Sequence, residues 1–249
     1  MQSKIALITG AGSGIGRAVT LRLLADGFSV ILSGRREHAL THTITLSNAP
    51  AERCLIVPGD VREPRYVADL FSMIENTFGR LDLLFNNAGI ARHQPIEDTC
   101  FDDWADTLAT NVTGPFLCTQ AAFRIMKQQK PMGGRIINNG SLSAHTPRPN
   151  AAAYTTSKHA ITGLTKSTAL EGRPYNIACG QIDIGNALTH ITADMGSGVI
   201  QASGSFQEEP VIDVQHVAAA VSNMAHLPLD TNVLFMSIMA TKMPFVGRG

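Results

Sequence analysis

The feature that most constrains the fold is an alternation of short apolar runs with longer segments of helical periodicity. Seven runs are predicted as strands, at residues 5–9, 28–33, 54–58, 81–86, 135–139, 176–182 and 233–237. Helices are predicted between them, at residues 15–25, 67–78, 111–129, 153–170 and 214–225. Continuous apolar strands that alternate with helices are typical of parallel βαβ units. The pattern therefore predicts an α/β, doubly wound fold, with a mainly parallel seven-stranded sheet and helices on both faces.

The length and composition suit one large domain. The chain has 249 residues, of which 44% are hydrophobic and 16% charged, so a sizeable core can form. No linker or internal repeat divides the sequence, and we expect residues 1–249 to form a single domain. A stretch rich in Gly and Ser, residues 189–210, is interpreted either as a surface loop or as a mobile lid.

Charge and cysteine content narrow the choice of partners. The formal net charge is zero, which argues against nucleic acid, because phosphate binding depends on clustered Lys and Arg. The cysteines are scattered without a CxxC pair, so we expect reduced thiols and no metal site. No apolar stretch approaches the ~18 residues of a membrane span, and the N-terminus lacks the apolar core of a signal peptide. We therefore expect a cytoplasmic protein without a membrane partner.

The first predicted strand leads into a glycine-rich turn with the sequence TGAGSGIG at residues 9–16. Glycines permit a tight turn and let a phosphate approach the main chain, while free N–H groups at the helix start attract its charge. Because the turn joins the first strand to the first helix, we interpret it as a dinucleotide site in a Rossmann-like domain. The predicted contacts are Gly10, Gly12, Ser13, Gly14, Ile15 and Gly16. A purely structural turn is the alternative.

The end of the second strand indicates which dinucleotide is bound. NAD sites hold the ribose hydroxyls with an acidic residue there, but this strand ends in Ser33-Gly34-Arg35-Arg36. A carboxylate would repel a 2′-phosphate, whereas guanidinium groups bind it through charge-assisted hydrogen bonds. We therefore predict NADP rather than NAD as the cofactor, bound by Arg35 and Arg36. Alternatively, the two arginines are a solvated pair that opens the next helix.

A candidate proton-transfer pair lies on the helix predicted at residues 153–170. Tyr154 and Lys158 are four residues apart and share one helix face. A nearby ammonium favours the phenolate, which a tyrosine must form to exchange protons. By itself such a pair is usually a surface feature. Three further features favour catalysis: Ser141 after the fifth strand, NNAG at residues 86–89 after the fourth, and Asn111 at the start of the next helix.

Taken together, these motifs resemble those of the short-chain dehydrogenase/reductase family, in its branch with TGxxxGxG and YxxxK motifs. The resemblance extends over nearly the whole chain, through TGAGSGIG, Asp60-Val61, NNAG, Asn111, Ser141 and YTTSK at residues 154–158. It implies an oxidoreductase that interconverts a small ketone and a secondary alcohol by hydride transfer with a nicotinamide cofactor.

The resemblance also implies catalytic roles for four residues. Tyr154 is expected to act as general acid in carbonyl reduction and as general base in alcohol oxidation. Ser141 is expected to stabilise developing charge on the substrate oxygen. Lys158 is expected to assist Tyr154 and to hold the nicotinamide ribose, and Asn111 to anchor a water that links Lys158 to solvent.

Further cofactor contacts are implied along the chain. Asp60 is expected to contact the adenine amino group, and the backbone of residues 87–89 to pass close to the adenosine ribose. The full set of contacts outside the glycine turn and the arginines is Asp60, Val61, Asn87, Ala88, Gly89, Tyr154, Lys158, Ile182 and Ile184.

The segment after the sixth strand departs from the family pattern. Members usually have Pro-Gly there, followed by a Thr that contacts the nicotinamide. Cys179 is interpreted as standing in place of the proline, and Ile184 in place of the threonine. Ile184 can offer a backbone N–H but no hydroxyl, so Asn186 is the candidate substitute donor.

The substrate itself is left open. Its contacts are expected near residues 91–95, 143–149 and 186–206, where His93, His145 and Arg148 are either ligands or plain surface residues. A 3-oxoacyl-thioester reductase and a sugar or polyol dehydrogenase are alternatives, and a catalytically silent NADP-binding regulator is the alternative outside enzymes. The resemblance further implies a homo-oligomer, most often a tetramer and otherwise a dimer.

Overall fold

The strands form one parallel sheet. They are β1 (Ile5–Thr9), β2 (Ser29–Gly34), β3 (Cys54–Pro58), β4 (Leu83–Asn86), β5 (Gly134–Asn139), β6 (Ile177–Ile184) and β9 (Phe235–Ile238). The computed structural model, which describes residues 3–188 and 198–246, pairs them in parallel in the order β3-β2-β1-β4-β5-β6-β9. The predicted seven-stranded, doubly wound sheet is therefore confirmed.

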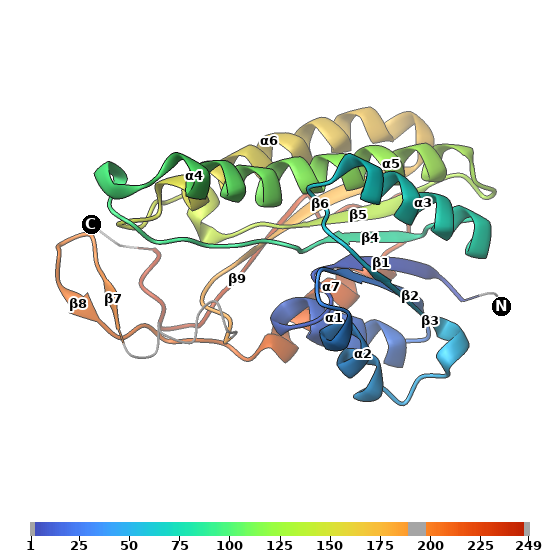
Figure 1. The fold of residues 1–249 in the computed structure, drawn as a ribbon, viewed down its shortest axis with the longest axis horizontal. Helices are drawn as coiled ribbons and strands as arrows, with labels where there is room; N and C mark the ends of the chain where they lie inside the picture. Colours follow the sequence, from blue (N-terminus) through green and yellow to red (C-terminus); the bar gives the residue numbers. More distant parts are fainter. Residues whose placement is uncertain (1–2, 189–197, 247–249) are drawn as a thin grey trace.

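Helices cover both faces of this sheet (Figure 1). One face carries α1 (Gly14–Ala25), α2 (Glu37–Thr45) and α7 (Val214–His226), and the other α3 (Pro64–Phe78), α4 (Phe101–Leu108), α5 (Gly114–Gln128) and α6 (Ala152–Gly172). Ala6 and Ile8 of β1 pack in the core with α1 and α7, whereas Ile5 and Leu7 pack with α3 and α5. Because alternate side chains point to opposite faces, an unbroken apolar strand requires cover on both.

The strand order reverses next to β1. From β1 the sheet extends through β2 to β3, and the chain then returns to the other side of β1 with β4. Loops at the carboxyl ends of the strands diverge at such a point and leave a crevice between them. Here the crevice lies beyond Thr9, Asn86 and Asn139, which end β1, β4 and β5.

The sequence pattern does not predict α2 and α4. The buried residues of α2 are Leu40 and Thr43, and that of α4 is Thr107, so both helices bury few side chains. A π-helical turn, Ala109–Thr113, joins α4 to α5. The prediction that Asn111 starts a helix is therefore wrong, because Asn111 lies inside a helical segment that begins at Phe101.

The sixth strand is longer than predicted. β6 continues to Ile184, whereas the apolar pattern ends it at Ile182. The polar side chains of Gln181 and Asp183 interrupt the apolar pattern. Both are fully buried, and they hydrogen-bond to each other, while Gln181 also accepts from Thr165. The crevice edge is consequently reached at Ile184 and not earlier.

A small hairpin occupies part of the stretch rich in Gly and Ser. It consists of β7 (Val199–Ile200) and β8 (Phe206–Gln207), which pair antiparallel as a separate two-stranded sheet. Residues 189–197 of the same stretch lie outside the described residues, so the two interpretations of this stretch remain predictions. None of the helices in the described ranges is long and apolar enough to cross a membrane.

Candidate active site

The glycine turn packs tightly against the end of β4. Gly10 and Gly14 have φ angles of +67° and +50°, in the left-handed region that favours glycine. A Cβ on Gly10 would lie 3.0 Å from the Cα of Ala88, and one on Gly16 only 2.2 Å from the carbonyl oxygen of Gly10. The glycines therefore let β4, the turn and α1 approach one another more closely than side chains would allow.

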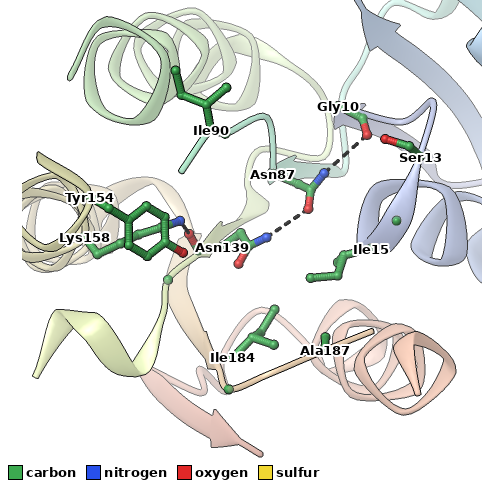
Figure 2. A pocket seen from close by; sticks show the side chains of 14 residues that line it. Gly10, Ser13, Ile15, Asn87, Ile90, Asn139, Tyr154, Lys158, Ile184 and Ala187 are labelled. Carbon is green, nitrogen blue, oxygen red and sulfur yellow. Dashed lines mark hydrogen bonds between the residues drawn. The ribbon is translucent and has the colours of Figure 1, made fainter. Parts of the chain in front are cut away.

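The start of α1 faces the crevice. Ser13 is the N-cap residue, and its side chain makes no capping hydrogen bond. Gly10, Ser13, Gly14 and Ile15 line the cavity that occupies the crevice (Figure 2). The N–H groups and the positive end of a helix start suit a phosphate, so the turn fits the pyrophosphate of a dinucleotide. Gly12 does not line the cavity and instead faces Ala39 of α2.

A chain of hydrogen bonds runs along one wall of the crevice. Asn87 donates from Nδ2 to the carbonyl oxygens of Thr9 at 2.9 Å and of Gly10 at 3.4 Å. Its Oδ1 accepts from Nδ2 of Asn139 at 2.9 Å, and the Asn139 carbonyl accepts from Nζ of Lys158 at 2.7 Å (Figure 2). Asn139 was absent from the predicted site, and it connects the glycine turn to the lysine on α6.

Tyr154 and Lys158 lie together on α6 and both line the crevice. The lysine Nζ is 5.4 Å from the centre of the tyrosine ring, and only 7% of Lys158 is exposed. An ammonium so shielded from water interacts more strongly with a neighbouring phenolate than a solvated one does. The pair therefore has the placement that proton exchange at the Tyr154 hydroxyl requires.

The side-chain amide of Asn111 connects two segments of the site. Its Oδ1 accepts from the N–H of Ile90, and its Nδ2 donates to the carbonyl of Ile90, each at 2.9 Å. The same Nδ2 donates to Oγ of Ser157 at 3.0 Å, and that hydroxyl donates to the Tyr154 carbonyl. Asn111 thereby joins the loop after β4 to α6 from a π-helical turn, a feature common at functional sites. Its expected water link to Lys158 stays a prediction.

Ser141 is held in place by its backbone. It precedes a short 3₁₀ turn, Leu142–Ala144, and its Oγ accepts from the N–H of Ser143 at 3.1 Å. Its own N–H donates to Oδ1 of Asp183 at 3.1 Å. Ser141 lines a second pocket that adjoins the crevice, and Tyr154 lines both. The two pockets therefore meet at the tyrosine.

Asp183 is a buried carboxylate that sequence reasoning missed. It is fully buried near the end of β6, and Oδ1 also accepts from Nε2 of Gln181 at 2.6 Å. Oδ2 lies 2.8 Å from Nε2 of His145, whose side chain is 43% exposed. A carboxylate so deeply buried needs hydrogen-bond partners of this kind. One partner is the N–H of Ser141, so the carboxylate also fixes the backbone at Ser141. An acidic residue between two isoleucines was the sequence signal that could have indicated this buried carboxylate.

The second pocket holds several of the residues expected near the substrate. His93 and Arg148 line it with Asn186 and Met243, whereas His145 instead contacts Asp183. Asn186, the candidate substitute donor, is 97% buried and hydrogen-bonds to side chains in this pocket wall. In the part of the chain that the structure describes, no three His, Cys, Asp or Glu side chains gather as a metal site would require.

The predicted ribose-phosphate contacts follow β2 and β3, and none of them lines the cavity in the crevice. Arg35 and Arg36 follow β2, and both are exposed, with Arg36 at the N-cap of α2. Asp60 accepts hydrogen bonds from the guanidinium of Arg62 at 2.8 and 2.9 Å. Burial raises the pKa of Asp60, but the hydrogen bonds and charge of Arg62 outweigh it and leave that pKa below its ordinary value. Arg35 adds to this lowering, so it lies near Asp60.

Other expected residues lie away from the crevice. Val61 is buried against α5. Ile182 is fully buried in the core beside α1 and α7. Cys179 lies in the middle of β6, where burial raises the pKa of its thiol to about 12. The residue interpreted as standing in place of the proline therefore lies within the strand, and that interpretation stays a prediction. Asn87, Gly89 and Ile184 do line the crevice.

Comparisons with known proteins point to one family. A family model described as short chain dehydrogenase matches residues 4–199. The chain is 36% identical to the 3beta-hydroxysteroid dehydrogenase of Mediterraneibacter gnavus, over 72% of this chain and 64% of that protein. It is 32% identical to the D-beta-hydroxybutyrate dehydrogenase of Rhizobium meliloti, over 85% of this chain and 82% of that protein. The solved structure of ElxO with NADP bound is 26% identical, covers 95% of this chain and 97% of that one, and gives a TM-score of 0.83.

Proposed function

Since the chain belongs to the short-chain dehydrogenase family and is an oxidoreductase acting on CH–OH groups, we propose that it interconverts a small ketone and a secondary alcohol. The observation that carries this proposal is the meeting of two pockets at Tyr154. The crevice suits a dinucleotide, and the second pocket is lined by the Ser141 hydroxyl. A nicotinamide bound in the crevice would supply or accept the hydride.

The chain's own residues would move the proton. Tyr154 would donate it to the carbonyl oxygen in reduction and take it from the hydroxyl in oxidation. The shielded ammonium of Lys158 lies beside the ring, where it would attract the negative charge left on the oxygen after donation. Ser141 would donate a hydrogen bond to the substrate oxygen, where negative charge develops. Asp183 supports this arrangement by holding the Ser141 backbone.

We assign NADP as the preferred cofactor from the residues after β2. Arg35 and Arg36 are exposed, and a 2′-phosphate could approach either guanidinium. Among the described residues, no hydrogen bond or ion pair holds Arg35. The relative solved with NADP, ElxO, agrees with this assignment.

The relatives with named substrates support an alcohol dehydrogenase over the alternative functions given above. One acts on a hydroxysteroid and one on a hydroxy acid, by their names. A silent NADP-binding regulator would have no need for Tyr154, Lys158 and Ser141 together at one place. We also expect a cytoplasmic homo-oligomer, on the strength of the family resemblance.

Replacing Tyr154 with phenylalanine tests the proposal. Tyr154→Phe removes the proton-carrying oxygen and leaves the ring, so turnover should fall by a factor of about 10³ or more, while NADPH binding changes little. A panel of ketones and alcohols is assayed with both cofactors at the absorbance band of the reduced nicotinamide, and NADPH binding is followed by fluorescence.

Tyr175→Phe is the matched control. Tyr175 packs edge-on against Phe123 just after α6 and lines neither pocket, so this variant should keep full activity. Turnover by Tyr154→Phe at the rate of the parent would contradict the proposed mechanism.

A further inference from the structure

Arg148, which lines the second pocket, forms an ion pair with Glu209. Nη2 of Arg148 lies 2.6 Å from Oε2 of Glu209. The pair is shielded from water, because the Arg148 side chain is 14% exposed and that of Glu209 is 1% exposed. Arg148 lines the pocket with Ser141 and Tyr154, so its charge lies in the space that a substrate would enter.

Two side-chain amides also hold the carboxylate. Asn186 donates from Nδ2 to the same Oε2 at 2.7 Å, and its Oδ1 accepts from Arg148 at 3.2 Å. Gln201, at the end of β7, donates to Oε1 at 3.0 Å. The carboxylate is thus held by side chains from three separate segments, after β6, within the hairpin and before α6. Such a set of bonds makes displacement of Glu209 by a competing anion costly.

Glu209 is ionised at neutral pH. Burial raises its pKa, but the hydrogen bonds from Arg148, Asn186 and Gln201 outweigh that effect and lower the pKa to about 2. The negative charge therefore lies against the Arg148 guanidinium, on a residue that does not itself line the pocket. Of the other described groups nearby, His93 has its pKa lowered by desolvation and by Arg148, and so favours its neutral form. Lys158 points its ammonium at the Asn139 carbonyl in the crevice.

We infer that Glu209 neutralises Arg148 and thereby restricts the second pocket to uncharged carbonyl substrates, excluding carboxylates of the same shape. The inference rests on the proposed function and names the substrate class of that site. A carboxylate entering the pocket would lose its hydration and would meet an arginine whose charge is already balanced. An uncharged carbonyl compound would lose much less hydration on the same path.

An isosteric pair of ketones tests this inference. Acetoacetamide and acetoacetate carry the same carbonyl group and differ in the charge at one end. The parent enzyme should show a kcat/KM for the amide at least about tenfold above that for the anion, given the strength of charge effects in shielded sites. Glu209→Gln leaves Arg148 unbalanced, and it should shift this ratio toward the anion by about tenfold or more.

Two further variants control the measurement. Glu208→Gln removes the same charge from an exposed neighbour, so its ratio should equal that of the parent. The double variant Arg148→Gln/Glu209→Gln removes both charges, and it should regain the preference for the amide. Equal ratios in Glu209→Gln and Glu208→Gln would overturn the inference, as would a parent enzyme that uses both ketones equally well.

Failure of the inference can be separated from failure of the proposed function. The Tyr154→Phe variant with bound NADPH should bind both ketones without turning them over, so that nicotinamide fluorescence reports affinity alone. A stronger affinity for the amide supports the inference, and equal affinities contradict it. Persistent turnover in this variant would instead contradict the role proposed for Tyr154.

Discussion

Arg35 is the single residue on which the choice of cofactor depends most. Arg35→Ala should raise the KM for NADPH by about tenfold or more, since a hydrogen bond between charged groups contributes about 1.5–3 kcal/mol. The KM for NADH should change by less than about twofold, because NADH has no 2′-phosphate to lose a contact. Steady-state kinetics with each cofactor and one ketone check this prediction.

Arg173→Ala provides the comparison for Arg35. Arg173 is also exposed, but it lies just before β6, at the amino ends of the strands and opposite the crevice. Its loss should leave both KM values unchanged. Equal increases of KM for NADPH and NADH in Arg35→Ala would count against the assignment of NADP.

Sequence reasoning succeeded for site residues that act through local spacing. Tyr154 and Lys158 share a helix face, so their proximity follows from helical geometry alone. Contacts between distant segments could not be foreseen in this way. His145 and Asp183 are 38 residues apart, and Arg148 and Glu209 are 61 apart. Such pairs become neighbours only through the sheet order and the course of the loops.

The connection between β1 and α1 shows how the packing of an element depends on one small residue. A Cβ on Gly16 would lie 2.2 Å from the carbonyl oxygen of Gly10, against a backbone atom that cannot move freely. Gly16→Ala should therefore lower the free energy of unfolding by about 1–3 kcal/mol, as overpacking commonly does. It should also weaken NADPH binding, because α1 must move away from the turn.

Denaturant unfolding and a fluorescence titration measure the two effects of Gly16→Ala. Ser13→Ala, in the same turn, is the control, since the Ser13 side chain has no capping hydrogen bond to lose. Its free energy of unfolding should change by less than about 0.5 kcal/mol. An unchanged stability of Gly16→Ala would show that α1 can shift without cost.

At the scale of elements, burial decided what the sequence could reveal. β1 and the central strands are apolar on both faces, so their runs are continuous and easily recognised. By contrast, α2 and α4 are short and bury few side chains. The end of β6 was misplaced for another reason. Its buried Gln181 and Asp183 carry polar groups whose partners lie elsewhere in the chain.

For the whole molecule, exposed apolar side chains support the expectation of a homo-oligomer. Leu170 on α6 is 59% exposed and Phe116 on α5 is 47% exposed, on the outer side of one helical layer. Exposed apolar area of this kind often marks an interface between chains. We therefore predict that Leu170→Glu lowers the mass in solution toward the 26.6 kDa of one chain, because a buried carboxylate would be unpaired there.

Light scattering checks this prediction. Leu46→Glu is the control, because Leu46 is 51% exposed at the end of α2, on the opposite face of the sheet, and its replacement should leave the mass unchanged. A parent protein that is already a monomer, or a Leu170→Glu variant of unchanged mass, would contradict the assignment of this interface.

The hydrogen bonds of Asn87 and Asn139 have a consequence for the binding and release of a cofactor. They tie the glycine turn, β4, β5 and α6 into one rigid wall, from Thr9 to Lys158. A cofactor cannot be released by spreading this wall without breaking several bonds at once. Release of a cofactor is therefore expected to leave the glycine turn, β4, β5 and α6 in place relative to one another.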